Sequence, residues 1–186
     1  MIVTAAHAVI EGEERSDVWI DIRDGLIHEI GDGPHSSAER KFSGTLIPGF
    51  VDIHCHGGGG FYFSNLNPDL IAVAIDTHRQ AGTTSLYASL VTADLDQLKA
   101  QIEALIPFVR SGDLAGIHLE GPYLSRAKCG AHAPELLRAP HLDEVQSLIK
   151  WGQGTIAMVT IAPELEGALD SIAWLASQGI IADIGH

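Results

Sequence analysis

The sequence has few cysteines, few basic side chains and no long apolar run. Its two cysteines, Cys55 and Cys129, do not form a disulfide framework, and residues 1–4 do not resemble a secretion signal. No apolar stretch approaches the ~20 residues needed to span a bilayer. Eleven basic against twenty-four acidic side chains give a formal net charge of -13, which opposes nucleic acid and anionic membranes as partners. We therefore expect a reduced, cytoplasmic protein that binds no nucleic acid and no membrane.

The first part of the chain, residues 1–45, is rich in short β-type patterns. Apolar runs cover Ile2–Ile10, Val18–Ile22 and Leu26–Ile30, and Asp24-Gly25 between the last two is a strong signal for a tight hairpin. The polar segment Gly31–Ser43 is expected to be a loop before the chain enters Leu46. The pattern predicts a small sheet in this region.

The remainder, residues 46–186, alternates strand and helix patterns, which is typical of an α/β fold with parallel strands. Expected strands lie at about 47–54, 83–90, 114–120, 155–161 and 180–186, and expected helices at about 68–80, 94–109, 143–150 and 168–178. A complete eight-stranded βα barrel takes about 250 residues. The chain of 186 residues is too short for that, so the fold we expect is an incomplete (β/α)8 TIM barrel that contains the first five strands.

The first of these strands carries two histidines, His54 and His56, separated by one residue. Side chains alternate between the two faces of a strand, so both imidazoles project from the same side and can bind one metal ion together. Cys55 points the other way. The glycines that follow, Gly57–Gly60, end the strand and let backbone approach whatever the histidines hold. A histidine pair on an exposed strand without metal is the alternative, but the apolar lead and the glycine run favour a metal site.

Further metal-binding side chains lie at the ends of later strands. In parallel barrels the working residues sit where the strands end, and here Glu120 closes the third strand and His186 the fifth. Oxygen and imidazole ligands suit zinc or a similar divalent ion. Glu120 could instead be an ordinary solvated carboxylate and His186 simply a terminal residue. His118 faces the same side as Glu120, and both a supporting role behind a ligand and an ordinary packing role stay open. The other histidines are read as surface or packing residues: His7, His28, His35, His78 and His141.

Five segments together resemble one enzyme family. They are Pro48–Gly57, His118–Leu124, Lys128–His132, Ala162–Glu164 and Gly185-His186, and in this order they are similar to the N-acetylglucosamine-6-phosphate deacetylases of the amidohydrolase superfamily. Proteins of that family are about twice this long, so the chain resembles their N-terminal half. The family's fold implies a metal-dependent barrel and a small β-sandwich domain, of which only residues 1–45 are present here.

The resemblance also implies roles for individual residues. Glu120 matches the family's carboxylate ligand, His186 matches the first of two later histidine ligands, and His54 with His56 matches a pair that binds a second metal in some members. Ala131 matches a position that contacts the sugar through its backbone, and His132 lies beside it. The second later histidine and the catalytic aspartate fall beyond His186, so no catalytic residue is expected within this chain.

The function implied by the resemblance is metal-dependent deacetylation of N-acetylglucosamine 6-phosphate to glucosamine 6-phosphate and acetate, in amino-sugar catabolism. It implies a divalent metal, expected to be zinc in one or two ions, a small-molecule amino-sugar phosphate as substrate, and a homodimer. Two alternatives stay open. One is another amidohydrolase that acts on a cyclic amide or a nucleobase, although such enzymes usually carry a lysine in place of Glu120. The other is an inactive metal-binding fragment.

Overall fold

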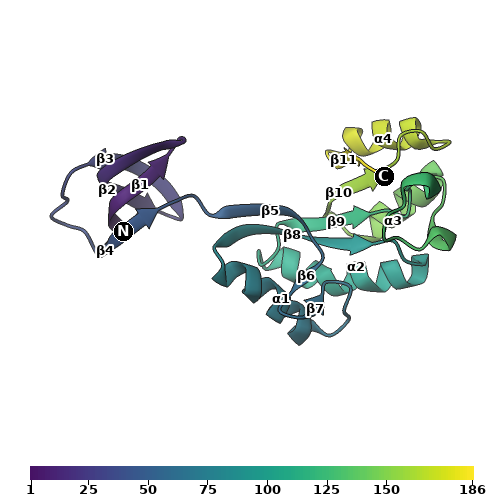
Figure 1. The fold of residues 1–186 in the computed structure, drawn as a ribbon, viewed down its shortest axis with the longest axis horizontal. Helices are drawn as coiled ribbons and strands as arrows, with labels where there is room; N and C mark the ends of the chain where they lie inside the picture. The colour runs from purple at the N-terminus through teal and green to yellow at the C-terminus, as the bar shows by residue number, and fades with distance from the viewer. The chain divides into compact units, whose positions relative to one another are not determined.

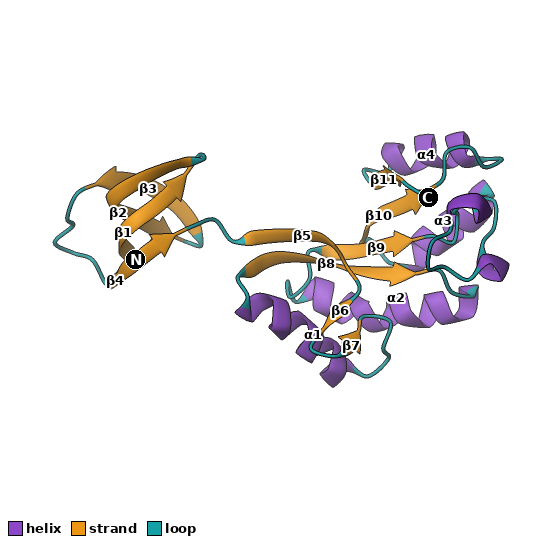
Figure 2. Ribbon diagram, in the orientation of Figure 1, coloured by secondary structure: helices purple, strands orange, loops and turns teal.

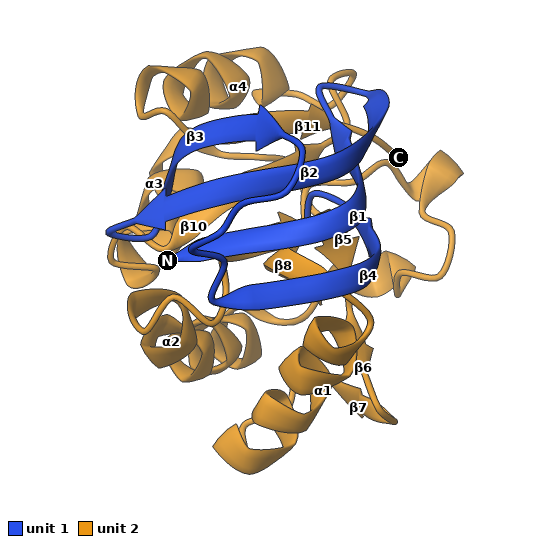
Figure 3. Cartoon of the chain, turned by 90° about the vertical axis from the view of Figure 1, so that its left-hand side faces the viewer, with its two compact units in different colours: residues 1–49 blue, residues 50–186 orange.

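The computed structural model describes residues 1–186, and the chain forms two compact units, Met1–Gly49 and Phe50–His186. Figure 3 shows them in blue and orange. Each unit has its own sheet, and we describe them separately. No helix in the structure combines the length and the apolar character that crossing a membrane would require.

The first unit is a four-stranded sheet in the order β3-β2-β1-β4. The strands are β1 (Ile2–Ile10), β2 (Glu13–Arg23), β3 (Leu26–Asp32) and β4 (Arg40–Leu46). The hairpin expected at Asp24-Gly25 is confirmed, with φ of 52° and 77°, as a tight turn between antiparallel strands requires. Its hydrophobic core cluster consists of only three buried residues, Ala8, Val18 and Ile20.

Strand β4 differs from the sequence prediction, which placed a loop over Gly31–Ser43. The structure begins β4 at Arg40 and pairs it in parallel with β1. The residues of β4 are mostly polar and exposed, so they lack the apolar alternation that identifies a strand. The prediction was wrong because this strand is formed by the open edge of β1, which lies about 35 residues earlier and leaves no local signal.

The second unit is a curled sheet of five strands, all parallel, in the order β11-β10-β9-β8-β5. The strands are β5 (Phe50–Cys55), β8 (Thr83–Val91), β9 (Gly116–Glu120), β10 (Ile156–Ile161) and β11 (Ile181–Ile184). The connecting helices are α1 (Pro68–Gln80), α2 (Leu95–Arg110), α3 (Leu142–Trp151) and α4 (Ala168–Ser177). In Figures 1 and 2, α1, α2 and α4 lie around the outside of the sheet. The predicted alternation of strand and helix is confirmed, as is the half-barrel of mixed α/β type.

Local signals explain where the first helices begin. The Asn67 side chain accepts a hydrogen bond from the Asp69 N–H and Pro68 occupies the first turn of α1. Asp94 accepts a hydrogen bond from the Gln97 N–H in the same way at α2. Helix α2 packs against the central strand β9, in which all five residues are buried. The buried strand therefore fixes the position of its last residue, Glu120, at the C-terminal edge of the sheet.

The edge strand β5 begins later than the sequence suggested, at Phe50 instead of at Ile47. Pro48 has no N–H to donate to a sheet, which explains the later start. Since β5 pairs only with β8, its apolar side chains stay exposed, with Val51 at 66% and Ile53 at 55%. A two-residue hairpin, β6 (Gly57–Gly58) with β7 (Phe61–Tyr62), follows directly.

Candidate metal centre

Strand β5 presents both of its histidines to one carboxylate, as period-two alternation predicts. His56 Nε2 lies 3.1 Å from Glu120 Oε2, and His54 Nε2 lies 3.5 Å from Glu120 Oε1. The two Nε2 atoms are 3.1 Å apart. Cys55 points away from the pair, and its Sγ lies 3.1 Å from His78 Nε2 on helix α1. The first strand thus supplies two convergent nitrogens.

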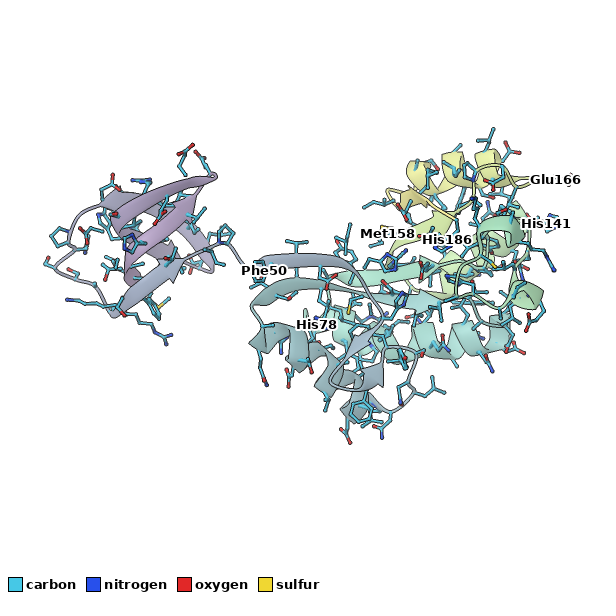
Figure 4. The ribbon with its side chains drawn as sticks, in the orientation of Figure 1. Phe50, His78, His141, Met158, Glu166 and His186 are labelled. Atoms are coloured by element: carbon cyan, nitrogen blue, oxygen red, sulfur yellow. The ribbon has the colours of Figure 1, made fainter.

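Two further imidazoles reach the same carboxylate from segments distant in sequence. His186, which follows β11 and is labelled in Figure 4, places Nε2 3.0 Å from Glu120 Oε1. His132, in the loop after β9, places Nε2 3.5 Å from Glu120 Oε2. Glu120 is only 6% exposed. Four imidazoles therefore surround one buried carboxylate, and it is shared by two ligand groups: His54, His56 and Glu120, and Glu120, His132 and His186.

Hydrogen bonds on the far side of two rings fix which nitrogen carries the proton. His56 Nδ1 lies 3.1 Å from the Ser89 carbonyl oxygen, and His186 Nδ1 lies 3.1 Å from that of Lys128. A carbonyl oxygen can only accept, so each Nδ1 must carry the proton. A neutral ring then presents its Nε2 lone pair to the cluster, whereas a protonated ring can donate from Nε2 to Glu120, as His56 does at 3.1 Å. Metal-binding histidines have this arrangement, with the outer nitrogen bonded to a carbonyl or carboxylate.

Hydrogen bonding and burial shift the pKa values of several residues in the cluster. The hydrogen bond with His56 holds the pKa of Glu120 well below its usual range, and the same bond raises the pKa of His56. Burial lowers the pKa of His132. The centre therefore keeps an ionised carboxylate among nitrogen donors. Imidazole with carboxylate is a donor set that suits zinc or a similar divalent ion, so the residues fit the metal that the sequence predicted.

His118 lies next to this cluster but does not join it. Its Nδ1 lies 2.9 Å from Ser89 Oγ and its Nε2 2.8 Å from Thr160 Oγ1, so neither nitrogen is free for a metal. The ring packs edge-on against His54 with the centroids 4.9 Å apart. Burial lowers the pKa of His118 to about 4, so the ring is neutral near pH 7. Of the two interpretations left open by the sequence, the supporting position behind a ligand agrees with these contacts.

A cavity adjoins the cluster on the side of the glycine hairpin. Its volume is about 330 Å³, and residues from β8, β9 and the following loop line it together with His56. Ala131 is one of the lining residues. His132, expected beside it, is instead turned towards Glu120 and is 8% exposed. The volume falls within the range of small-molecule sites.

Three features of this centre were not predicted from the sequence: the approach of His132 to Glu120 and the contacts of Ser89 and Thr160. His132 was expected near the substrate, and its approach to Glu120 depends on a loop closure that no local pattern encodes. Ser89 is one of several hydroxyl residues in β8, and Thr160 is the single hydroxyl residue of the otherwise apolar β10. The available signal was their position: each precedes the end of a parallel strand by one or two residues.

His78 was read as a packing residue, and its contacts agree with that interpretation. Its Nε2 lies 3.0 Å from the Gly57 carbonyl oxygen as well as near Cys55, which ties α1 to the segment after β5. Asp52 lies 4.0 Å away across the same ring. Figure 4 shows His78 on α1, apart from His186.

Comparison with known proteins agrees with this geometry. No family model matches the chain. An N-acetylgalactosamine-6-phosphate deacetylase of Escherichia coli O157:H7 is 34% identical over 177 residues, which are 90% of this chain and 47% of that protein. An N-acetylglucosamine-6-phosphate deacetylase of Bacillus subtilis is 30% identical over 201 residues, covering 100% of this chain and 50% of that protein. The chain thus spans about half the length of the curated relatives it matches.

A solved structure also agrees with this chain. The N-acetyl-D-glucosamine-6-phosphate deacetylase of Mycobacterium smegmatis superposes with a TM-score of 0.94 at 44% identity, covering 100% of this chain and 50% of that chain. A variant of the same enzyme was solved in complex with N-acetyl-D-glucosamine 6-phosphate. The resemblance predicted from the sequence is confirmed: in sequence and in fold, the chain is similar throughout its length to about half of an N-acetylglucosamine-6-phosphate deacetylase.

Proposed function

We propose that the whole protein removes the acetyl group of N-acetylglucosamine 6-phosphate and releases glucosamine 6-phosphate and acetate. The observation that carries the proposal is the match, at 44% identity over the entire chain, to an enzyme solved with that sugar phosphate bound. The cluster around Glu120 and the cavity beside it supply the site that such a reaction needs. Amino-sugar catabolism in the cytoplasm is the corresponding cellular role.

A divalent ion, zinc by the donor chemistry, would be held by His54, His56, Glu120 and His186. One or two ions are compatible with the two ligand groups that share Glu120. When bound, the ion would acidify a water molecule and polarise the acetamide carbonyl. Glu120 supplies the negative charge that a divalent cation requires, and the Ser89 and Lys128 carbonyls hold the Nδ1 protons of His56 and His186 so that each Nε2 stays available.

The substrate side of the site is formed by the loop after β9. Ala131 would contact the sugar through its backbone, as the family resemblance implies, and His132 closes the space between that loop and Glu120. The proton for the leaving amine would come from an aspartate outside residues 1–186. A homodimer and a small β-sandwich that includes the sheet of residues 1–45 complete the proposal; both rest on the resemblance alone.

A second candidate substrate is N-acetylgalactosamine 6-phosphate, because two matching relatives, from Escherichia coli O157:H7 and a Shewanella strain, are deacetylases of that sugar. The two substrates differ only in the direction of the hydroxyl at carbon 4. The assay must therefore compare both sugar phosphates.

The decisive experiment measures acetate release by the full-length protein from both sugar phosphates, with dihydroorotate and hydantoin as competing substrate classes. We expect deacetylation of N-acetylglucosamine 6-phosphate to have the highest kcat/KM. Preference for the galactosamine compound would move the assignment to the second candidate. Faster opening of a cyclic amide would contradict the deacetylase proposal altogether.

A further inference from the structure

A chain of hydrogen bonds crosses the half-barrel beside the cluster around Glu120. It begins at the edge strand β5. The Cys55 N–H on β5 donates to Ser89 Oγ on β8 at 3.1 Å. A backbone N–H can only donate, so the Ser89 hydroxyl hydrogen is left for another partner. That partner is His118 Nδ1 on β9, at 2.9 Å. Ser89 can therefore donate this hydrogen to Nδ1.

The other end of the hydrogen-bond chain fixes its direction. His118 Nε2 lies 2.8 Å from Thr160 Oγ1 on β10. The Thr160 hydroxyl then donates to Asp183 Oδ2 on β11 at 2.9 Å. An ionised carboxylate can only accept. Thr160 uses its hydrogen for Asp183, so its oxygen accepts from His118 Nε2. In the neutral ring Nδ1 then carries no proton and accepts from Ser89 Oγ, which gives a single tautomer of His118.

The hydrogen-bond chain contains one residue from each of the five strands. Its three middle residues are nearly inaccessible to water. Ser89 is 2% exposed, His118 0% and Thr160 2%. Hydrogen bonds in such surroundings are stronger than in water, and breaking one leaves a buried group without a partner. These hydrogen bonds therefore fix the positions of the five strands relative to one another beside the cluster.

Two contacts connect this chain to the proposed ligands. The carbonyl of Ser89 accepts from His56 Nδ1, and the ring of His118 packs edge-on against His54. Ser89 thus bonds to both residues at the end of β5, through its hydroxyl to the Cys55 N–H and through its carbonyl to the His56 ring. The edge strand β5 has no partner on its other side, so these bonds are important for placing its histidine pair.

We infer that Ser89, His118 and Thr160 are positioning residues that orient the His54 and His56 pair for metal and keep His118 itself from binding it. The inference rests on the proposed metal site and adds to it the groups that set its geometry. Replacement of groups that orient metal ligands typically weakens metal binding about 10 to 100-fold.

The test is zinc affinity of the full-length protein, measured by competition with a chromophoric chelator. Ser89→Ala is expected to raise the zinc Kd roughly 10 to 100-fold. Thr160→Val, which removes the hydroxyl and keeps the shape, is expected to raise it in the same direction, and Thr160→Ser is expected to restore the original value. The matched control is Ser171→Ala, because Ser171 is also fully buried and its hydroxyl bonds the Pro140 carbonyl at 3.2 Å, away from the cluster.

A second readout is independent of metal. In the metal-free protein, ¹⁵N NMR of the His118 ring should show a protonated Nε2 and an unprotonated Nδ1. The opposite tautomer would overturn the inference, as would wild-type zinc affinity in Ser89→Ala or an equal loss in Ser171→Ala.

The Glu120→Gln variant separates this inference from the proposed function. If it loses zinc while Ser89→Ala binds normally, the positioning role alone is wrong. If it retains zinc, the metal site itself is wrong and the positioning inference fails with it.

Discussion

The two units of the chain use histidine in opposite ways. In the first unit His7 and His28 stand apart, each near a single carboxylate, with His7 3.5 Å from Glu14 and His28 3.8 Å from Asp21. In the second unit four histidines lie within 3.5 Å of one carboxylate, Glu120. The residue type is the same, so the arrangement of the strands must account for the difference.

Strand direction provides that account. In the first unit neighbouring strands β1, β2 and β3 are antiparallel, so their ends alternate between the two edges of the sheet. In the second unit all five strands are parallel and end at the same edge. Side chains at those ends therefore meet, which is why sites in such folds are found there. The strand topology, more than the number of histidines, therefore determines whether histidines distant in sequence form a cluster.

The strongest test of this comparison is to remove the shared carboxylate. We expect Glu120→Gln to reduce bound zinc to background and to abolish acetate release in the full-length protein, because both ligand groups lose their only anion. Elemental analysis and the acetate assay measure the two effects. Glu103→Gln on the exposed face of α2 is the matched control and should keep both properties. Stoichiometric zinc in the Glu120 variant would remove this residue from the ligand set.

Metal should stabilise the two units unequally. Zinc at a free concentration 100 times its Kd should raise the free energy of unfolding of the second unit by about 2.7 kcal/mol, since only the folded site binds it. Trp19 lies in the first unit and Trp151 and Trp174 in the second. Denaturant curves for Trp19→Phe, which leaves reporters only in the second unit, should therefore shift with zinc. The fluorescence of a variant retaining Trp19 alone should not shift, and an equal shift would contradict the assignment.

Glycine substitutions should also separate the units. Gly121, directly after Glu120, has a φ of +91°, and a Cβ there would collide with Thr92 Oγ1. We expect Gly121→Ala to cost about 1 to 3 kcal/mol of folding free energy, measured by denaturant unfolding. Gly44 in β4 has open space around it and no positive φ, so Gly44→Ala should change stability by less than about 1 kcal/mol. Equal losses at both positions would show that local strain does not distinguish the two glycines.

The smallest expected effect concerns acid stability of the first unit. The hydrogen bond from Arg23 lowers the pKa of Asp21 below its ordinary value of 3.8. A lowered folded pKa contributes stability above the unfolded value, and this contribution is lost as the pH falls through the folded value. Asp21→Asn should therefore flatten the loss of stability below about pH 4, monitored through Trp19 fluorescence. The exposed Glu13→Gln is the control, and an identical pH profile for Asp21→Asn would contradict the role of this pair.

The sequence predicted the second unit well because its signals are local and repeated. Alternation along β5 correctly placed His54 and His56 on one face, and strand ends placed Glu120 and His186 near them. The same reasoning failed for β4, whose strand character depends on β1. It also gave no indication of the hydrogen-bond partners of His118, because Ser89 and Thr160 resemble any polar residue within a strand. Predictions thus succeeded where position along the chain determines geometry, and failed where partners far apart in sequence determine it.

The position of Glu120 at the centre of four imidazoles has a consequence for how substitutions combine. Each imidazole interacts with the same carboxylate, so the free-energy effects of replacing them are coupled through it. Residues that share a partner commonly show interaction energies of roughly 0.5 to 3 kcal/mol in double-mutant cycles. Once Glu120 is replaced, the further loss of His56 or His186 should cost far less than it does in the original protein. The cluster therefore behaves as one cooperative unit whose parts cannot be assigned separate energies.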